Sequence, residues 1–126
     1  MRRFIAITAL AAALAVLGTA VAMAATRTIT LKPSVSFRTA TGQAKFQTEN
    51  NQRELEVEVE HIKVLAGKKV NVFVNGGKFA TPTVSSLGAF DVQRNTAKGQ
   101  AVPRIVNGST VRVRTLGGTL IASGSF

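Results

Sequence analysis

Hydrophobic and polar residues alternate without a break between Glu54 and Glu60. Leu55, Val57 and Val59 fall on one side of this stretch, and four glutamates fall on the other. A period of two with β-branched residues is typical of a strand that has one buried face and one solvent-facing face, whereas a helix would scatter the glutamates around its circumference. The pattern therefore predicts a strand whose apolar side must be covered by other strands.

Similar short segments recur along the rest of the chain, separated by turn residues. Alternating or β-branched stretches lie at residues 28–31, 43–47, 70–74, 78–84, 89–93, 110–115 and 119–126. Asn50-Asn51, Asn75-Gly76 and Gly117-Gly118 are typical of tight turns, because these residues adopt positive φ readily. The alternation slips by one residue at His61, which indicates a bulge or the end of the strand. About eight short strands predict a single all-β domain, either a β-sandwich or a small β-barrel.

The first 24 residues follow a different pattern. Two arginines precede an apolar run from Phe4 to Leu17, and Ala22-Met23-Ala24 meets the small-x-small rule for signal-peptide cleavage. The run is shorter than the roughly 20 residues that span a bilayer, which favours a cleaved signal peptide over an uncleaved membrane anchor. We therefore expect a signal peptide at residues 1–24 and an exported all-β domain at residues 25–126. That domain would have no transmembrane segment and would lie in the periplasm, the cell envelope or the extracellular space.

The charge of the chain is strongly positive and unevenly distributed. It has 16 Lys and Arg against six Asp and Glu, and loss of the two arginines in the signal peptide leaves a net charge of +8. Five of the six acids lie between Glu49 and Glu60, and only Asp91 lies elsewhere. Such a dipole attracts anions over a long range, although surface charge also serves solubility alone.

Four lysines close to the predicted hairpin at Val70 form the candidate anion-binding site: Lys63, Lys68, Lys69 and Lys78. An exported domain would meet anionic polysaccharide or an anionic membrane surface, and these are the partners we expect. Nucleic acid is disfavoured, because the chain has no Tyr or Trp on which bases could stack. The sequence does not indicate an oligomeric state.

The alternating glutamates offer a second kind of site. Glu54, Glu56, Glu58 and Glu60 supply the hard oxygen ligands that calcium prefers. Alternate residues on one strand are about 6.6–7 Å apart, too far for one ion without other ligands, so calcium binding here is the alternative interpretation. A simpler role is an ion-pair ladder with Arg112 and Arg114, which face outward on another predicted strand.

Catalytic chemistry has little support in the sequence. The chain has one His, one Asp and no Cys, and a Ser-His-Asp arrangement would need His61 and Asp91 without any nucleophile-elbow motif. Neighbouring glutamates on a strand have a spacing that overlaps glycosidase geometry, but a flat strand face offers no cleft in which a carboxyl pKa would rise. We expect a non-enzymatic interaction or structural module that needs no cofactor.

Three segments carry a resemblance to known domains: Gly42-Gln43-Ala44-Lys45-Phe46, the alternating residues 55–59, and the closing residues 111–114 with 117–126. Together they resemble small bacterial secreted β-domains of uncharacterised function, and their order is similar to that of the CHRD domain, a secreted β-domain. The CHRD pattern has a histidine-containing motif in its middle, whereas this chain has Asn71-Val72-Phe73-Val74-Asn75 there. The metal role that the motif implies is therefore not carried over, and no catalytic residue transfers.

Overall fold

The structure is a computed structural model, and it describes residues 24–126. Its elements in chain order are β1 (Ala25–Pro33), η1 (Val35–Phe37), β2 (Thr41–Glu49), β3 (Gln52–Glu60), η2 (Lys63–Leu65), β4 (Val70–Val74), β5 (Gly77–Ala80), β6 (Phe90–Asn95), η3 (Thr96–Lys98), β7 (Thr110–Thr115) and β8 (Leu120–Ser125), where η marks a 3-10 helix. The prediction of an all-β fold with about eight strands is confirmed. The predicted signal peptide lies, apart from Ala24, outside the described residues and stays a prediction. None of the described helices is long and apolar enough to cross a membrane.

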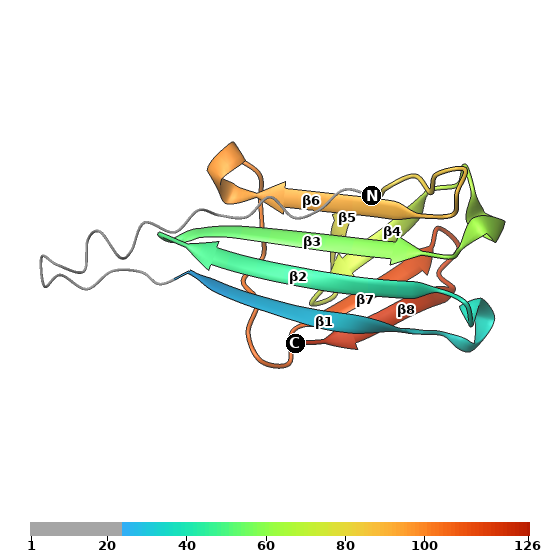
Figure 1. Cartoon of the computed structure of the whole chain (residues 1–126), viewed down its shortest axis with the longest axis horizontal. Helices are drawn as coiled ribbons and strands as arrows, with labels where there is room; N and C mark the ends of the chain where they lie inside the picture. Colours follow the sequence, from blue (N-terminus) through green and yellow to red (C-terminus); the bar gives the residue numbers. More distant parts are fainter. Residues whose placement is uncertain (1–23) are drawn as a thin grey trace, which may run out of the picture.

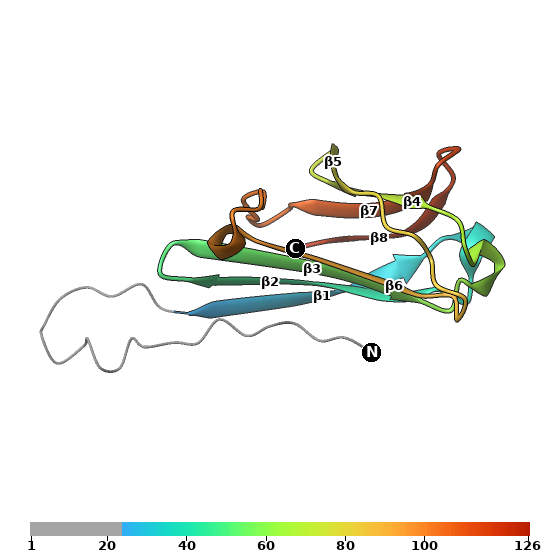
Figure 2. The ribbon, with the colours of Figure 1, turned by 90° about the horizontal axis from the view of Figure 1, so that it is seen from above.

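All eight strands belong to one antiparallel sheet, in the order β5-β4-β7-β8-β1-β2-β3-β6. Strand β1 takes part in both halves of this sheet, because residues 25–31 pair with β2 while Lys32 and Pro33 pair with β8. The sheet therefore folds over into two layers, with β1, β2, β3 and β6 in one and β4, β5, β7 and β8 in the other (Figures 1 and 2). In the described part of the chain no ladder joins β5 to β6, so the flattened barrel stays open along this side.

Two tight turns have the backbone conformation that their sequences predict. Asn50 and Asn51 connect β2 to β3 with φ of 51° and 67°. Asn75 and Gly76 connect β4 to β5 with φ of 51° and 81°. The irregularity predicted at His61 is also confirmed, because β3 ends one residue earlier and His61 itself has a φ of 63°.

The core lies between the two layers. Leu55, Val57 and Val59 of β3 are fully buried, and so are Val111 and Val113 of β7 in the opposite layer. The predicted inward faces of these strands are therefore confirmed, and each such side chain contributes roughly 1.5–3 kcal/mol through its burial. All eight strands and the core described here fall within residues 25–126, so we expect a chain that begins at Ala25 to keep this fold.

The outer face of β3 is less exposed than its alternation predicts. Glu54 and Glu56 are only 0% and 4% exposed, although they stand on the polar side of the strand. One reason is that β3 has a hydrogen-bonded neighbour on each side, so that cross-strand side chains flank each glutamate. Gln93 of β6, for example, donates a hydrogen bond from Nε2 to Oε2 of Glu54.

The predicted ion-pair ladder between these glutamates and Arg112 and Arg114 is wrong. Strand β7 pairs with β4 and β8 in the other layer, whereas β3 pairs with β2 and β6. Arg112 stands opposite Phe73 and Ser123 instead. Alternation identifies which side of a strand faces outward, but it does not identify the neighbouring strand.

Candidate functional site

Two inward-facing rows of side chains end in arginine at the same end of the sandwich. On β3 the row that contains Val57 and Leu55 continues to Arg53, and on β6 the row that contains Val92 continues to Arg94. Arg94 and Leu55 are partners in the β3–β6 ladder. Because side chains on one face recur at every second residue, both arginines stand where the pattern of the strand would place a core residue.

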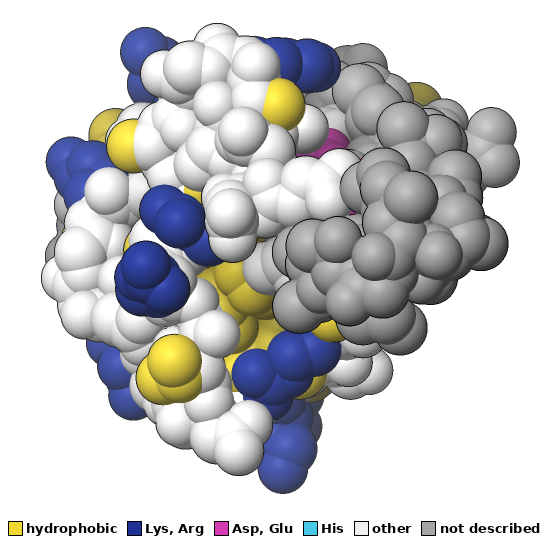
Figure 3. Space-filling model, turned by 90° about the vertical axis from the view of Figure 1, so that its left-hand side faces the viewer, with side chains coloured by type: hydrophobic (Ala, Val, Ile, Leu, Met, Phe, Trp, Pro, Cys, Tyr) yellow, Lys and Arg dark blue, Asp and Glu magenta, His cyan; other side chains and the backbone are white. Residues whose placement is uncertain are grey.

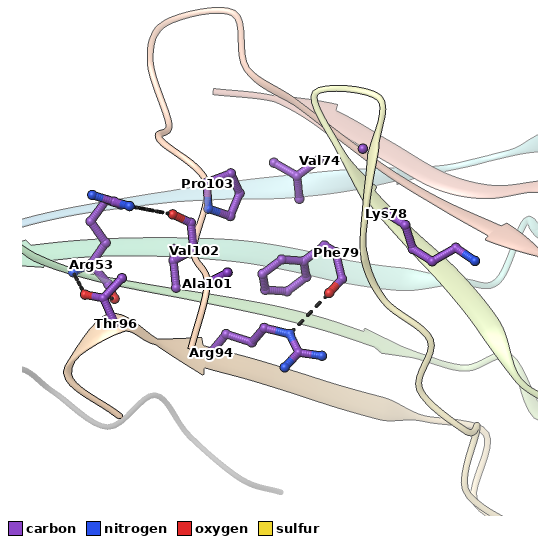
Figure 4. A pocket seen from close by; sticks show the side chains of 10 residues that line it. Arg53, Val74, Lys78, Phe79, Arg94, Thr96, Ala101, Val102 and Pro103 are labelled. Carbon is purple, nitrogen blue, oxygen red and sulfur yellow. Dashed lines mark hydrogen bonds between the residues drawn. The ribbon is translucent and has the colours of Figure 1, made fainter. Parts of the chain in front are cut away.

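Arg94 spans the open side of the sheet between β6 and β5. Its Nε donates a hydrogen bond to the carbonyl oxygen of Phe79 at 3.2 Å, and its guanidinium carbon lies 5.7 Å from the centre of the Phe79 ring (Figure 4). A cation–π contact of this kind contributes about 0.5–1 kcal/mol at an exposed site. A side chain thus connects the two edge strands where the backbone ladder is missing.

Arg53 holds the loop that borders the same space. Its Nε and Nη2 both donate to the carbonyl oxygen of Val102, at 3.1 and 2.8 Å. The backbone N–H of Arg53 donates to Oγ1 of Thr96 at 2.8 Å, which attaches the start of β3 to η3. These contacts position residues 101–103, a segment without regular structure, beside the two layers.

A cavity of about 510 Å³ lies between the layers at this end, and we call it the open-end cavity. It is lined by both layers and by the loop: Arg53, Val74, Gly77, Lys78, Phe79, Arg94, Thr96, Ala101, Val102 and Pro103. Figure 3 looks onto this end of the molecule and shows a hollow with a hydrophobic floor and Lys and Arg side chains around it. The volume falls within the range of about 300–1,000 Å³ that is usual for pockets that bind small molecules.

The three cations of the open-end cavity have no acidic partner among residues 24–126. Arg53 and Arg94 donate to backbone carbonyl oxygens only, and Lys78 is exposed. A carbonyl oxygen orients a guanidinium group but does not neutralise its charge. The cavity therefore combines an apolar lining with uncompensated positive charge.

The structure separates the four lysines that the sequence grouped as an anion-binding site. Lys63, Lys68 and Lys69 lie in the connection between β3 and β4, whereas Lys78 lies at the start of β5 in the wall of the open-end cavity. Lys69 directly precedes β4, and Lys78 pairs with Phe73 close to the other end of that strand. Only Lys78 therefore shares a site with the two inward arginines.

Sequence reasoning gave neither Arg53 nor Arg94 a role. The sequence nevertheless contained an indication for both. Alternation places Arg53 on the same face of its strand as Leu55 and Val57, and it places Arg94 on the same face as Val92. A charged residue that continues an apolar row marks the point where that row reaches solvent or a ligand.

Carboxylates on the outer face of β3 come together with one from β6. Glu56, Glu58 and Asp91 each have one oxygen within 4.8 Å of the others, because Glu58 and Asp91 are direct partners in the ladder. Glu54 and Glu60 of the predicted calcium-ligand set are not in this group. Burial raises the pKa of Glu58, and the charges of Asp91 and Glu60 raise it further, while a hydrogen bond from Gln43 lowers it.

The raised pKa of Glu58 predicts a pH-dependent cost to stability. The folded state favours the protonated form of the Glu58 carboxyl. The stability that Glu58 contributes is therefore fully present below the pKa that Glu58 has in the unfolded chain, and it is lost as the pH rises through the pKa of Glu58 in the folded state. Glu58→Gln should therefore raise the melting temperature at neutral pH and leave it unchanged at pH values well below the ordinary glutamate pKa. The gain should be small, because solvent screens charges on a partly exposed strand face. Thermal melts of both proteins across the pH range check this, and a lower melting temperature of the variant at neutral pH would contradict it.

The comparison with protein-family models, with curated proteins and with solved structures gave no significant match.

Proposed function

We propose that this protein is an exported, non-enzymatic binding module that holds an anionic ligand with an apolar part in the open-end cavity. The observation that carries the proposal is the position of Arg53 and Arg94, which end two core rows and face an apolar space without an acidic partner in the described chain. Phe79 and Val74 would contact the hydrocarbon or ring of the ligand. The guanidinium groups and the Lys78 ammonium would contact its carboxylate, sulfate or phosphate.

The energetics of half-buried charge support an anion at this place. Arg53 and Arg94 are each partly removed from water, which disfavours an unpaired cation. A bound anion would provide the missing countercharge, and the apolar lining would strengthen the attraction by excluding water. The net charge of +8 beyond residue 24 adds a long-range attraction for such ligands. Export is proposed on the signal-peptide pattern of the sequence.

Charge reversal at the mouth of the cavity tests the proposal. The fluorescent anion 8-anilinonaphthalene-1-sulfonate combines rings with a sulfonate and can be titrated into the purified chain that begins at Ala25. We expect saturable binding that weakens with added salt, and an affinity that Lys78→Glu lowers by about tenfold, equivalent to about 1.4 kcal/mol. Lys78 is exposed and makes no described side-chain contact, so the fold should survive the substitution.

Lys32→Glu is the matched control for this experiment. It changes the net charge by the same amount at an exposed residue of β1, near the other end of the sandwich. Its affinity for the probe should equal that of the wild type. If both substitutions weakened the binding of the probe equally, the probe would respond only to overall charge, which would contradict the proposal. An absence of saturable binding by the wild type would refute it outright.

A second candidate function is calcium binding on the outer face of β3. The observation that favours it is the approach of oxygens from Glu56, Glu58 and Asp91 to within 4.8 Å. A cation there would offset the repulsion that contributes to the raised pKa of Glu58. The melts described above, repeated with calcium chloride, should then show a rise in melting temperature that Glu58→Gln reduces. No rise in the wild type would remove this candidate.

A further inference from the structure

Four separate loops expose a large hydrophobic side chain at the end of the sandwich away from the open-end cavity. Val35 of η1 is 83% exposed, Val64 of η2 is 77% exposed, Leu87 is 82% exposed and Leu116 is 62% exposed. Val106 is the fifth large hydrophobic side chain in the described chain with a comparable exposure, at 61%. Val106 belongs to a turn that contacts the β4–β5 turn through Ser109, at the cavity end.

Hydrogen bonds join the two loops that carry Val64 and Leu87. The backbone N–H of Ile62, just before η2, donates to the carbonyl oxygen of Gly88 at 3.0 Å. Gly88 follows Leu87 directly, and a Cβ at this glycine would lie 2.5 Å from the backbone nitrogen of Lys63. The backbones of the two loops are thus in close contact.

The other two loops are tied to the same end. Oγ1 of Thr39, in the segment after η1, donates to the carbonyl oxygen of His61 at 3.0 Å, which joins the Val35 loop to the start of the η2 connection. Thr115, at the start of the turn that carries Leu116, pairs with the first residue of β4. Figures 1 and 2 show η1, η2, the turn at residues 85–88 and the β7–β8 turn together at the right-hand end.

Positive charge lies among these hydrophobic side chains. Arg38, Lys63, Lys68 and Lys69 are all exposed and belong to the same loops. The loop residues 34–40, 61–69, 81–89 and 115–119 contain no Asp or Glu. The loops at this end of the sandwich therefore present hydrophobic side chains beside cations only, and the nearest acids, Glu60 and Asp91, belong to the strands β3 and β6. We call this end the docking end.

We propose that the docking end binds a lipid bilayer surface that carries anionic headgroups. Exposed hydrophobic residues on separate loops can each enter the interfacial layer of a bilayer, and lysines beside them contact headgroup phosphates. The exposed lysines beside these hydrophobic side chains favour a lipid surface that carries negative charge. This inference is independent of the proposed cavity ligand, because it involves different residues at the opposite end.

Vesicle co-sedimentation tests the docking end. The chain that begins at Ala25 is used, because an attached apolar leader would itself bind lipid. Vesicles of phosphatidylcholine alone are compared with vesicles that contain phosphatidylcholine and phosphatidylglycerol in equal parts. We expect binding to the anionic vesicles, little binding to the neutral ones, and a loss of binding as salt increases. Equal binding to both kinds of vesicle, or to neither, would overturn the proposal.

Three variants separate the contributions to vesicle binding. Val64→Ser combined with Leu87→Ser should lower the affinity for anionic vesicles by about tenfold, because two side chains that enter the interface are lost. Lys68→Gln combined with Lys69→Gln should reduce the preference for anionic over neutral vesicles. Val106→Ser is the matched control and should bind like the wild type. All the substituted residues are exposed, so melting temperatures should agree among the variants.

Two further outcomes decide against a membrane. If Val64→Ser with Leu87→Ser bound vesicles as well as Val106→Ser does, the exposed hydrophobic residues would have no role and the proposal would fail. If the wild type bound soluble dextran sulfate more tightly than anionic vesicles, and the serine variant bound it equally well, the lysines would serve a polyanion instead of a bilayer.

Discussion

Val57→Asp should abolish the cooperative thermal unfolding of the domain. Val57 is fully buried on β3 and stands between Ala44 of β2 and Val92 of β6. A carboxylate at this position would have no cation or hydrogen-bond donor beside it in the described core. The expected cost is several kcal/mol, against a total stability of about 5–15 kcal/mol for a domain of this kind.

The control for Val57→Asp introduces the same side chain on the other face of the sheet. Thr28→Asp places a carboxylate at an exposed position of β1, opposite Lys45 of β2. The low β-propensity of aspartate should cost at most about 1 kcal/mol there. Circular dichroism during heating should show a normal transition for Thr28→Asp and none for Val57→Asp. If the two variants melted alike, the assignment of the inner face of β3 would be wrong.

Gly88→Ala should cause the second-largest loss of stability. Gly88 has a φ of 83°, a conformation that costs an L-residue about 1–2 kcal/mol. A Cβ there would also lie 2.5 Å from the nitrogen and 2.6 Å from the Cα of Lys63, and these backbone atoms cannot rotate away. The overlap should add about 1–3 kcal/mol. Since 1 kcal/mol corresponds to about 4–8 °C in a domain of this size, the melting temperature should fall by roughly 10 °C or more.

Gly99→Ala is the matched control for the contact at Gly88. Gly99 has a similar φ of 77°, but a Cβ there would have no atom within 4 Å. Gly99→Ala should therefore lose only the stability that the left-handed backbone costs. The difference in melting temperature between the two variants then measures the contact of Gly88→Ala with Lys63. Equal melting temperatures would contradict the close approach of the two loops at the docking end.

Local features of the fold were predictable because short-range patterns encode them. The alternation from Glu54 to Glu60 gave the inner face of β3, and Asn50-Asn51 and Asn75-Gly76 gave two turns with positive φ. The pairing of distant strands was not predictable in the same way. The connection at residues 99–109 takes the chain from β6 in one layer to β7 in the other, so Arg112 and Arg114 lie far from the glutamates in strand order.

The candidate site was partly visible in the sequence. Lys78 was predicted as a site residue, and it lines the cavity. Lys68 and Lys69 were grouped with it in the sequence, but they lie beyond the other end of β4. Alternation places Arg53 and Arg94 on the core-facing side of their strands, but their place in the cavity depends on the unpaired edges of β5 and β6. Which edges remain unpaired is a property of the whole sheet, and no single stretch of sequence contains it.

The open-end cavity should hold an anion with an apolar part, and a nuclear magnetic resonance titration tests this most directly. Dodecanoate is added to the ¹⁵N-labelled chain that begins at Ala25, and the backbone amide shifts are followed. We predict saturable changes that are largest at Gly77, Thr96 and Ala101, which line the cavity, and at most small changes at Gly67 and Gly118 near the docking end. Changes that do not saturate, or that centre on Gly67 and Gly118, would contradict the claim.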